Sequence, residues 1–121
     1  MFDISIKGRM ASAHFLRCYE GPCKNLHGHT WHVEAVVAGE KLNDIGLLAD
    51  FRDLKKRLNT LLDSLDHICF NDLEHFKKVN PSTENIAQYI YREFKSQVAP
   101  LTLKHVRVWE SDTASVTYYE S

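Results

Sequence analysis

The sequence predicts an α+β domain in which a four-stranded antiparallel sheet carries two helices on one face. Two segments near the start alternate apolar and polar residues with a period of two, the middle of the chain spaces apolar residues as a helix does, and two short alternating segments close it. The predicted order is strand, strand, helix, helix, strand, strand. Because domains usually hold about 100–150 residues, these 121 residues are expected to form one domain, residues 1–121.

The first two strands are predicted from their alternation. Residues 2–14 place even-numbered side chains on the inward face, and the pattern stays in register to His14. Gly21-Pro22 then marks an irregular connection. Residues 27–38 predict the second strand, with odd-numbered side chains facing inward.

The first helix is predicted to follow a turn over residues 39–46. Asp50 stands where an N-cap belongs, because its carboxylate can accept backbone N–H bonds. From there, one apolar stripe at helical spacing contains Phe51, Leu54, Leu58, Leu61, Leu62 and Leu65.

The second helix is predicted after an irregular stretch over residues 68–80. Ser82 or Thr83 serves as its cap, and Pro100 ends it. Its apolar face contains Ile86, Ala87, Ile90, Tyr91, Phe94 and Val98. The last two strands are predicted over residues 101–110 and 113–120.

Composition excludes several classes of protein. The 15 Lys and Arg nearly balance the 16 Asp and Glu, so the net charge of −1 gives no general attraction for nucleic acid or an anionic membrane. No apolar run approaches the roughly 20 residues that span a bilayer. The N-terminus has neither a basic leader nor an apolar run, so a cytoplasmic protein is expected.

Three cysteines, an odd count without a secretory signal, favour thiol or metal chemistry over a disulfide framework. Cys69, between Ile68 and Phe70, is interpreted as a small buried apolar residue. Cys18 has no assignment. Cys23 lies four residues before His27, where a nearby cation would favour its thiolate as a base or nucleophile.

Three histidines are expected to converge. His27 and His29 lie two residues apart, so on a strand they share a face. If the first two strands pair antiparallel, His14 at the end of the first strand lies close to His27 and His29 at the start of the second. Neutral imidazoles suit Zn²⁺, and three of them without a fourth protein ligand leave the open position typical of catalytic sites.

Two other interpretations of these histidines stay open. In the first, they are unrelated histidines, one in a turn and two flanking Gly28. In the second, Cys18, Cys23, His27 and His29 form a structural zinc site, although finger-type histidine pairs are usually separated by three to five residues rather than one.

Two further groups carry chemistry. Asp66 can fix the tautomer of His67 and raise its basicity, as an acid–base relay requires, although a histidine at a helix C-terminus is also favoured by the helix dipole. Glu110 follows Val106 and Val108 on the inward face, where a carboxylate needs partners such as the N–H groups of a ligand. Otherwise the strand simply ends at Trp109.

Together, these residues resemble the 6-pyruvoyl-tetrahydropterin synthase superfamily over nearly the whole chain. The resemblance rests on His14, Cys23–His29, Leu65–His67, Pro81–Asn85 and Val108–Ser111. It is strongest to the branch of 6-carboxy-5,6,7,8-tetrahydropterin synthases of queuosine (7-deazaguanine) biosynthesis, in which the cysteine stands four positions before the histidine pair. The pyruvoyl synthases typically have a longer spacing, and a folate-linked branch has a glutamate near that position.

The resemblance implies a tunnelling fold, in which the sheets of three subunits join into a barrel and two such rings form a homohexamer. It implies that His14, His27 and His29 bind zinc and that Cys23 is the general base. It also implies that Asp66 and His67 form a proton relay, often contributed by a neighbouring subunit. The pterin would be bound by Glu110, with Ser82 and Thr83.

The resemblance also implies a lyase that converts 7,8-dihydroneopterin triphosphate to 6-carboxy-5,6,7,8-tetrahydropterin, acetaldehyde and triphosphate with Zn²⁺ as cofactor. Release of 6-pyruvoyl-tetrahydropterin without C–C cleavage is the nearer alternative, and a non-catalytic pterin-binding oligomer is another. Unranked candidates for neutralising the triphosphate are Lys7, Arg9, Arg17 and Lys24.

Overall fold

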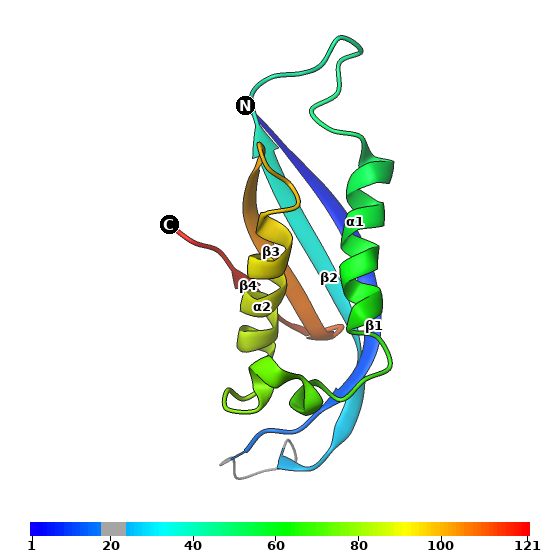
Figure 1. Ribbon diagram of the computed structural model, residues 1–121, viewed down its shortest axis with the longest axis vertical. Coiled ribbons are helices and arrows are strands. Elements are labelled where there is room, and N and C mark those ends of the chain that lie inside the picture. Colours follow the sequence, from blue (N-terminus) through cyan, green and yellow to red (C-terminus); the bar gives the residue numbers. More distant parts are fainter. Residues whose placement is uncertain (18–23) are drawn as a thin grey trace.

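The computed structural model describes residues 1–17 and 24–121, and it confirms the predicted order of elements (Figure 1). Its four strands form one antiparallel sheet in the order β1-β2-β3-β4. The elements are β1 (Phe2–His14), β2 (His27–Gly39), α1 (Phe51–Ser64), α2 (Thr83–Lys95), β3 (Thr102–Ser111) and β4 (Ala114–Tyr118). The stretch between the helices, expected to be irregular, contains two short 3₁₀ helices, η2 (Phe70–Asp72) and η3 (Glu74–Phe76).

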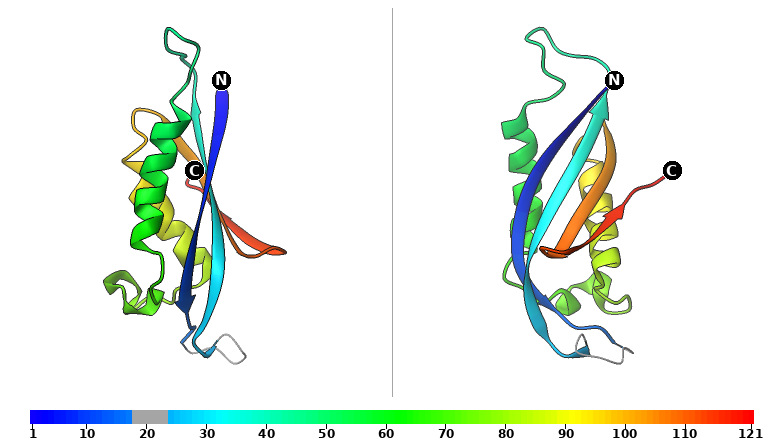
Figure 2. Two further views of the ribbon diagram at one scale, coloured as in Figure 1. Left: turned by 90° about the vertical axis from the view of Figure 1, so that its right-hand side faces the viewer. Right: turned by 180° about the vertical axis from the view of Figure 1, so that it is seen from behind.

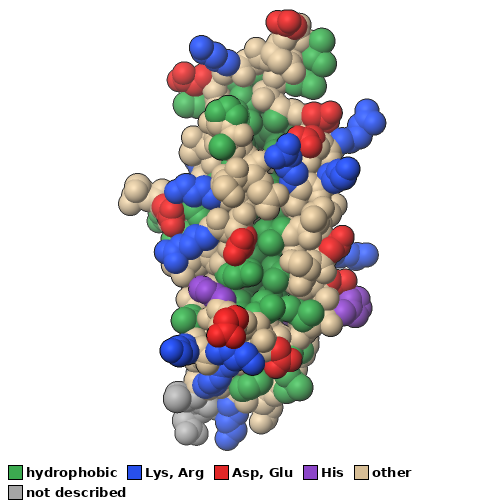
Figure 3. Space-filling view, viewed as in Figure 1, with side chains coloured by type: hydrophobic (Ala, Val, Ile, Leu, Met, Phe, Trp, Pro, Cys, Tyr) green, Lys and Arg blue, Asp and Glu red, His purple; other side chains and the backbone are tan. Residues whose placement is uncertain are grey.

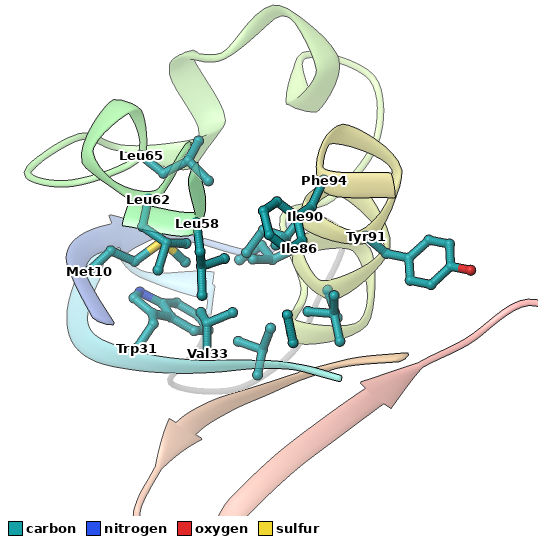
Figure 4. Packing of buried hydrophobic residues seen from close by; sticks show 14 of the residues in the cluster. Met10, Trp31, Val33, Leu58, Leu62, Leu65, Ile86, Ile90, Tyr91 and Phe94 are labelled. Carbon is teal, nitrogen blue, oxygen red and sulfur yellow. The ribbon is translucent and has the colours of Figure 1, made fainter. Parts of the chain in front are cut away.

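The two layers meet in a single apolar core. The left view of Figure 2 shows both helices on one side of the sheet, as predicted. The inward parity of the first two strands is also confirmed, because Ile6 and Met10 of β1 and Trp31, Val33 and Ala35 of β2 are at most 2% exposed. Side chains from α1 and α2 point toward these residues (Figure 4).

The helices begin at polar caps. The Asp50 carboxylate accepts a hydrogen bond from the Arg52 backbone N–H at 2.8 Å, which confirms it as the cap of α1. Of the two candidates for α2, Ser82 is the cap, since its hydroxyl accepts from the Asn85 backbone N–H at 3.2 Å. The prediction that Phe51 joins the apolar stripe of α1 was wrong, because it is 51% exposed, whereas Leu54 in the same turn is 4% exposed.

The outer edge of β1 is covered over only part of its length. The chain that leaves α1 runs along it: the Ala13 N–H donates to the Ile68 carbonyl at 2.8 Å, and the His67 N–H donates to the Ala11 carbonyl at 2.6 Å. Within the described part of the chain, residues 2–9 of β1 and the whole of β4 pair with only one neighbouring strand each.

Charged groups of both signs are spread over the helix-covered side (Figure 3), consistent with the near balance of acidic and basic residues. None of the helices in residues 1–17 and 24–121 has the length and apolar character needed to cross a membrane.

Candidate metal centre

The pairing of β1 with β2 assembles the three histidines, as the alternation predicts. His14 lies opposite His27 at the end of the ladder, and Ser12 lies opposite His29. The rings of His14 and His29 lie next to Trp31, with ring centroids 4.9 Å and 5.0 Å from that of the indole, and the His27 ring contacts both histidines. The Trp31 indole N–H donates to the Ser12 carbonyl at 3.1 Å, and this hydrogen bond holds the indole ring in place beside the histidines.

Backbone carbonyls set the tautomers of two of these rings. The Nδ1 atom of His14 lies 2.7 Å from the Pro81 carbonyl oxygen, and Nδ1 of His27 lies 2.7 Å from the Asn25 carbonyl oxygen. A carbonyl only accepts, so each Nδ1 carries the proton and each neutral ring presents a lone pair at Nε2. These two Nε2 atoms face each other at 3.0 Å. Two lone pairs at that separation repel each other, and a cation bound by both nitrogen atoms would replace this repulsion with attraction.

His29 and Glu110 complete the cluster. Nε2 of His29 is buried and makes no hydrogen bond. Glu110 Oε1 lies 3.4 Å from Nε2 of His14 and 3.5 Å from Nε2 of His29. One ligand atom from each of the four residues lies within 4.8 Å of the others. Three imidazoles and a carboxylate are a donor set that suits Zn²⁺, so these residues fit a divalent metal.

Burial keeps two of the imidazoles in the form that binds metal. Desolvation lowers the pKa of His14, and the neighbouring His27 and His29 lower it further against the opposing effects of the Pro81 carbonyl and Glu110. Desolvation likewise lowers the pKa of His29. Because only a neutral imidazole has a free lone pair, both effects favour ligation.

The alternation predicts Glu110 on the inward face, and the structure places its carboxylate next to the histidines. Expected as a pterin contact, its carboxylate reaches the histidines and also lines a hollow with Thr83 and Glu84 of α2 and Ser115 and Val116 of β4. It therefore lies between the histidine cluster and this recess. Sequence reasoning had left the centre without a fourth protein group.

The two residues that begin the second helix have different positions. The Ser82 hydroxyl is engaged as the N-cap, whereas Thr83 is 9% exposed and lines the hollow next to Glu110. The expectation that both bind substrate stays a prediction, and Thr83 is the one that faces the recess.

Asp66 and His67 form a pair at the edge of β1. Oδ2 of Asp66 accepts from Nδ1 of His67 at 2.7 Å, and Oδ1 accepts from the Ala11 N–H at 2.7 Å. The Ala11 N–H, followed by His67, lowers the pKa of Asp66, so the carboxylate stays charged. His67 has a φ of 56° and a side chain that is 82% exposed. Its Nε2 therefore points its lone pair toward solvent beside a shallow hollow that also contains His29.

The remaining candidates are spread over the chain. Cys18 and Cys23 lie outside the described residues. Lys7 and Arg9 have the opposite parity to His14 and lie on the helix-free face, with Lys7 Nζ 5.6 Å from the Trp109 ring centroid. Cys69 is only partly buried, and its Sγ lies 3.8 Å from Oδ1 of Asn71.

Sequence reasoning missed three residues next to the centre: Pro81, which orients His14, and Asn71 and Asn80, which bind the backbone just beyond it. Their contacts join residues 56 to 67 positions apart. No local period relates such positions, so Pro81 gave a signal only as the start of the motif Pro81–Asn85 and not as a partner of His14.

Comparison with known proteins gives a consistent result. The family model described as 6-pyruvoyl tetrahydropterin synthase matches residues 3–121. A 6-carboxy-5,6,7,8-tetrahydropterin synthase from Bacillus subtilis is 33% identical, over 97% of this chain and 84% of its own. A dihydroneopterin monophosphate aldolase from Pyrococcus furiosus is 35% identical over 77% of each chain. The solved structure of 6-pyruvoyl tetrahydropterin synthase from Caenorhabditis elegans matches with a TM-score of 0.89 and 27% identity, covering 99% of this chain and 96% of that one.

Proposed function

The chain belongs to the 6-pyruvoyl tetrahydropterin synthase family, and from that premise we propose that it is a zinc-dependent 6-carboxy-5,6,7,8-tetrahydropterin synthase. Its reaction converts 7,8-dihydroneopterin triphosphate to 6-carboxy-5,6,7,8-tetrahydropterin, acetaldehyde and triphosphate, a step of queuosine (7-deazaguanine) biosynthesis. The observation that carries the proposal is the convergence of the Nε2 atoms of His14, His27 and His29, of which His14 and His27 keep theirs unprotonated through Nδ1–H bonds to carbonyls.

The histidines would hold the Zn²⁺, which when bound supplies Lewis-acid polarisation of the substrate's side-chain hydroxyls. The Pro81 and Asn25 carbonyls keep two of the rings in the ligating tautomer. Trp31 closes the inner side of the cluster against the core and keeps water from that side.

Proton transfer is assigned to groups around the cluster. Cys23 is proposed as the general base. His67, with Nδ1–H donated to Asp66, has Nε2 free to accept a proton, and the Asp66 carboxylate stabilises the imidazolium that forms. The lowered pKa of Asp66 supports this role because a protonated partner would not stabilise the cation.

Pterin recognition is assigned to the recess beside Glu110. A carboxylate accepts two parallel N–H bonds, which matches the 2-amino-4-oxo edge of a pterin. Thr83 lines the same recess and offers a hydroxyl, while the Ser82 hydroxyl also belongs to the proposed contact set.

A homohexamer built from two barrel rings is part of the proposal. The first part of β1 and all of β4 offer backbone groups for pairing with a second copy. The Asp66–His67 pair is exposed, so it is placed to serve a neighbouring subunit's centre.

The test is mass analysis of the products formed by zinc-loaded protein from 7,8-dihydroneopterin triphosphate. We expect 6-carboxy-5,6,7,8-tetrahydropterin with acetaldehyde. Finding 6-pyruvoyl-tetrahydropterin would assign the chain to the pyruvoyl branch. In a parallel incubation with dihydroneopterin monophosphate, aldol cleavage would assign it the activity for which the Pyrococcus furiosus relative is named. Unchanged substrate would instead favour a pterin-binding protein without catalysis.

A further inference from the structure

The chain just beyond β1 is held by side chains instead of by a strand. The pairing of β1 with β2 ends at His14 and His27. The next backbone group is bound by an asparagine: the Phe15 N–H donates to Oδ1 of Asn71 at 3.0 Å, and Nδ2 of Asn71 donates to the Phe15 carbonyl at 3.0 Å. Both hydrogen bonds of a strand pair are therefore supplied by one carboxamide.

The same arrangement recurs two residues later. The Arg17 N–H donates to Oδ1 of Asn80 at 2.9 Å, and Nδ2 of Asn80 donates to the Arg17 carbonyl at 2.9 Å. In an extended chain, residues 15 and 17 present their N–H and C=O groups on the same side. A carboxamide has one acceptor and a donor pair in the plane of a peptide group, so each asparagine takes the place of a residue in a neighbouring strand.

Both asparagines are themselves anchored. Asn71 lies in η2 and is 3% exposed. The carbonyl of Asn80 accepts from Nδ2 of Asn85 in the first turn of α2 at 2.9 Å. The residue after Asn80 is Pro81, whose carbonyl accepts from Nδ1 of His14. The imidazole of His14 and the backbone that follows it are thus held by two consecutive residues.

We propose that Asn71 and Asn80 are positioning residues of the metal centre, which hold His14 in its ligating orientation through the backbone of Phe15 and Arg17. This inference rests on the proposed function only in taking the three histidines as metal ligands. Without the two carboxamides, the backbone after His14 has no partner for these four groups among the described residues, and the strand end carrying the ligand loses its fixed direction.

The test compares Asn80→Asp with the matched change Asn59→Asp on the exposed face of α1. Asn80→Asp has the same size but replaces the amide donor with an oxygen that faces the Arg17 carbonyl. We expect Zn²⁺ affinity, measured by competition with a chelator, to fall by about 10–100-fold, the usual effect of losing a group that orients a ligand. The visible absorption of the Co²⁺-loaded protein should change as well, because it reports ligand geometry.

Folding is checked first by circular dichroism of the metal-free proteins. If Asn80→Asp does not fold, Asn80→Ser replaces it, since serine adds no charge and still removes the paired contact. Asn71→Asp should act in the same direction. Asn59→Asp should leave Zn²⁺ affinity and the Co²⁺ spectrum unchanged.

Each result decides the proposal. A folded Asn80 variant with wild-type Zn²⁺ affinity and an unchanged Co²⁺ spectrum overturns it, even if the unfolding midpoint falls, because the asparagine would then act on stability alone. A wild-type chain that binds neither metal overturns the metal centre and the positioning role together. A wild-type chain that binds the metal but forms no product overturns only the proposed reaction.

Discussion

His29 of the three-histidine centre and His67 of the Asp66–His67 pair line the same hollow, yet the centre and the pair are built in different ways. The centre draws its groups from two strands and packs them against the core, with His14 only 1% exposed. The pair comes from adjacent residues, pinned to the edge of β1 through Ala11, and its imidazole is 82% exposed. The groups proposed to hold an ion are buried or half-buried by tertiary packing, whereas the imidazole proposed to move protons faces outward.

This difference predicts that substitutions in the two regions affect different properties of the protein. Changes in the centre should remove the metal, and changes in the pair should leave the metal bound and slow the reaction. The expected effects below run from the largest to the smallest.

The largest effect is expected for His29→Gln. Losing one imidazole should weaken Zn²⁺ binding by more than the about 10–100-fold typical of losing an orienting partner, and turnover should be lost with the metal. Zinc per chain, measured by elemental analysis after gel filtration, checks this. His32→Gln is the matched control, because His32 lies on the same strand with opposite parity and is exposed. Full zinc content in His29→Gln would contradict the assignment of ligands.

Asp66→Asn should slow turnover by about 10²–10⁴-fold, the usual contribution of a positioned acid–base group, while zinc content stays at the wild-type level. The amide cannot stabilise a protonated His67 as the carboxylate does. Steady-state rates and zinc content measured on the same preparation check both halves. Loss of zinc together with activity would show that the pair and the centre are one structural unit.

The same carboxylate makes acid stability depend on pH. Its pKa is lowered by the hydrogen bond from Ala11 and by His67, so the folded protein binds fewer protons here than the unfolded chain. The stabilisation is therefore complete above the unfolded pKa of about 3.9 and is lost as the pH falls through the lower folded value. Denaturant unfolding of the metal-free protein, followed as the pH falls from about 5 to below the usual aspartate pKa of about 3.9, should show a shallower pH dependence in Asp66→Asn. An identical dependence in both proteins would assign the acid sensitivity to other groups.

The smallest effect is expected for substitutions of Ser82, which distinguish its role as a helix cap from its proposed role as a substrate contact. As the cap of α2, its replacement by alanine should lower the free energy of unfolding by about 0.5–2 kcal/mol, whereas glycine should cost only a few tenths. Both changes remove the hydroxyl. A KM that rises equally in Ser82→Ala and Ser82→Gly would support the proposed substrate contact, and an unchanged KM in Ser82→Gly would assign the residue to capping alone.

Much of this protein follows from local patterns in its sequence. The period of two in the first strands places His14, His27 and His29 on the face of Trp31, and the register of β1 and β2 confirms it. Asp50 was predicted as a cap for a similar reason, because capping depends on contacts within one turn. Such patterns are readable because side-chain direction is set by backbone geometry over a few residues.

The tertiary structure alone decided the rest. Glu110 reaches the histidines because β3 pairs with β2, and Asn71 and Asn80 bind the backbone beyond His14 because the chain after α1 folds back along β1, over separations of 56 and 63 residues. The exposure of Phe51 likewise depends on what packs over a helix turn, which helical spacing does not encode. Contacts between distant segments depend on how whole layers meet, and no local period in the chain reports that.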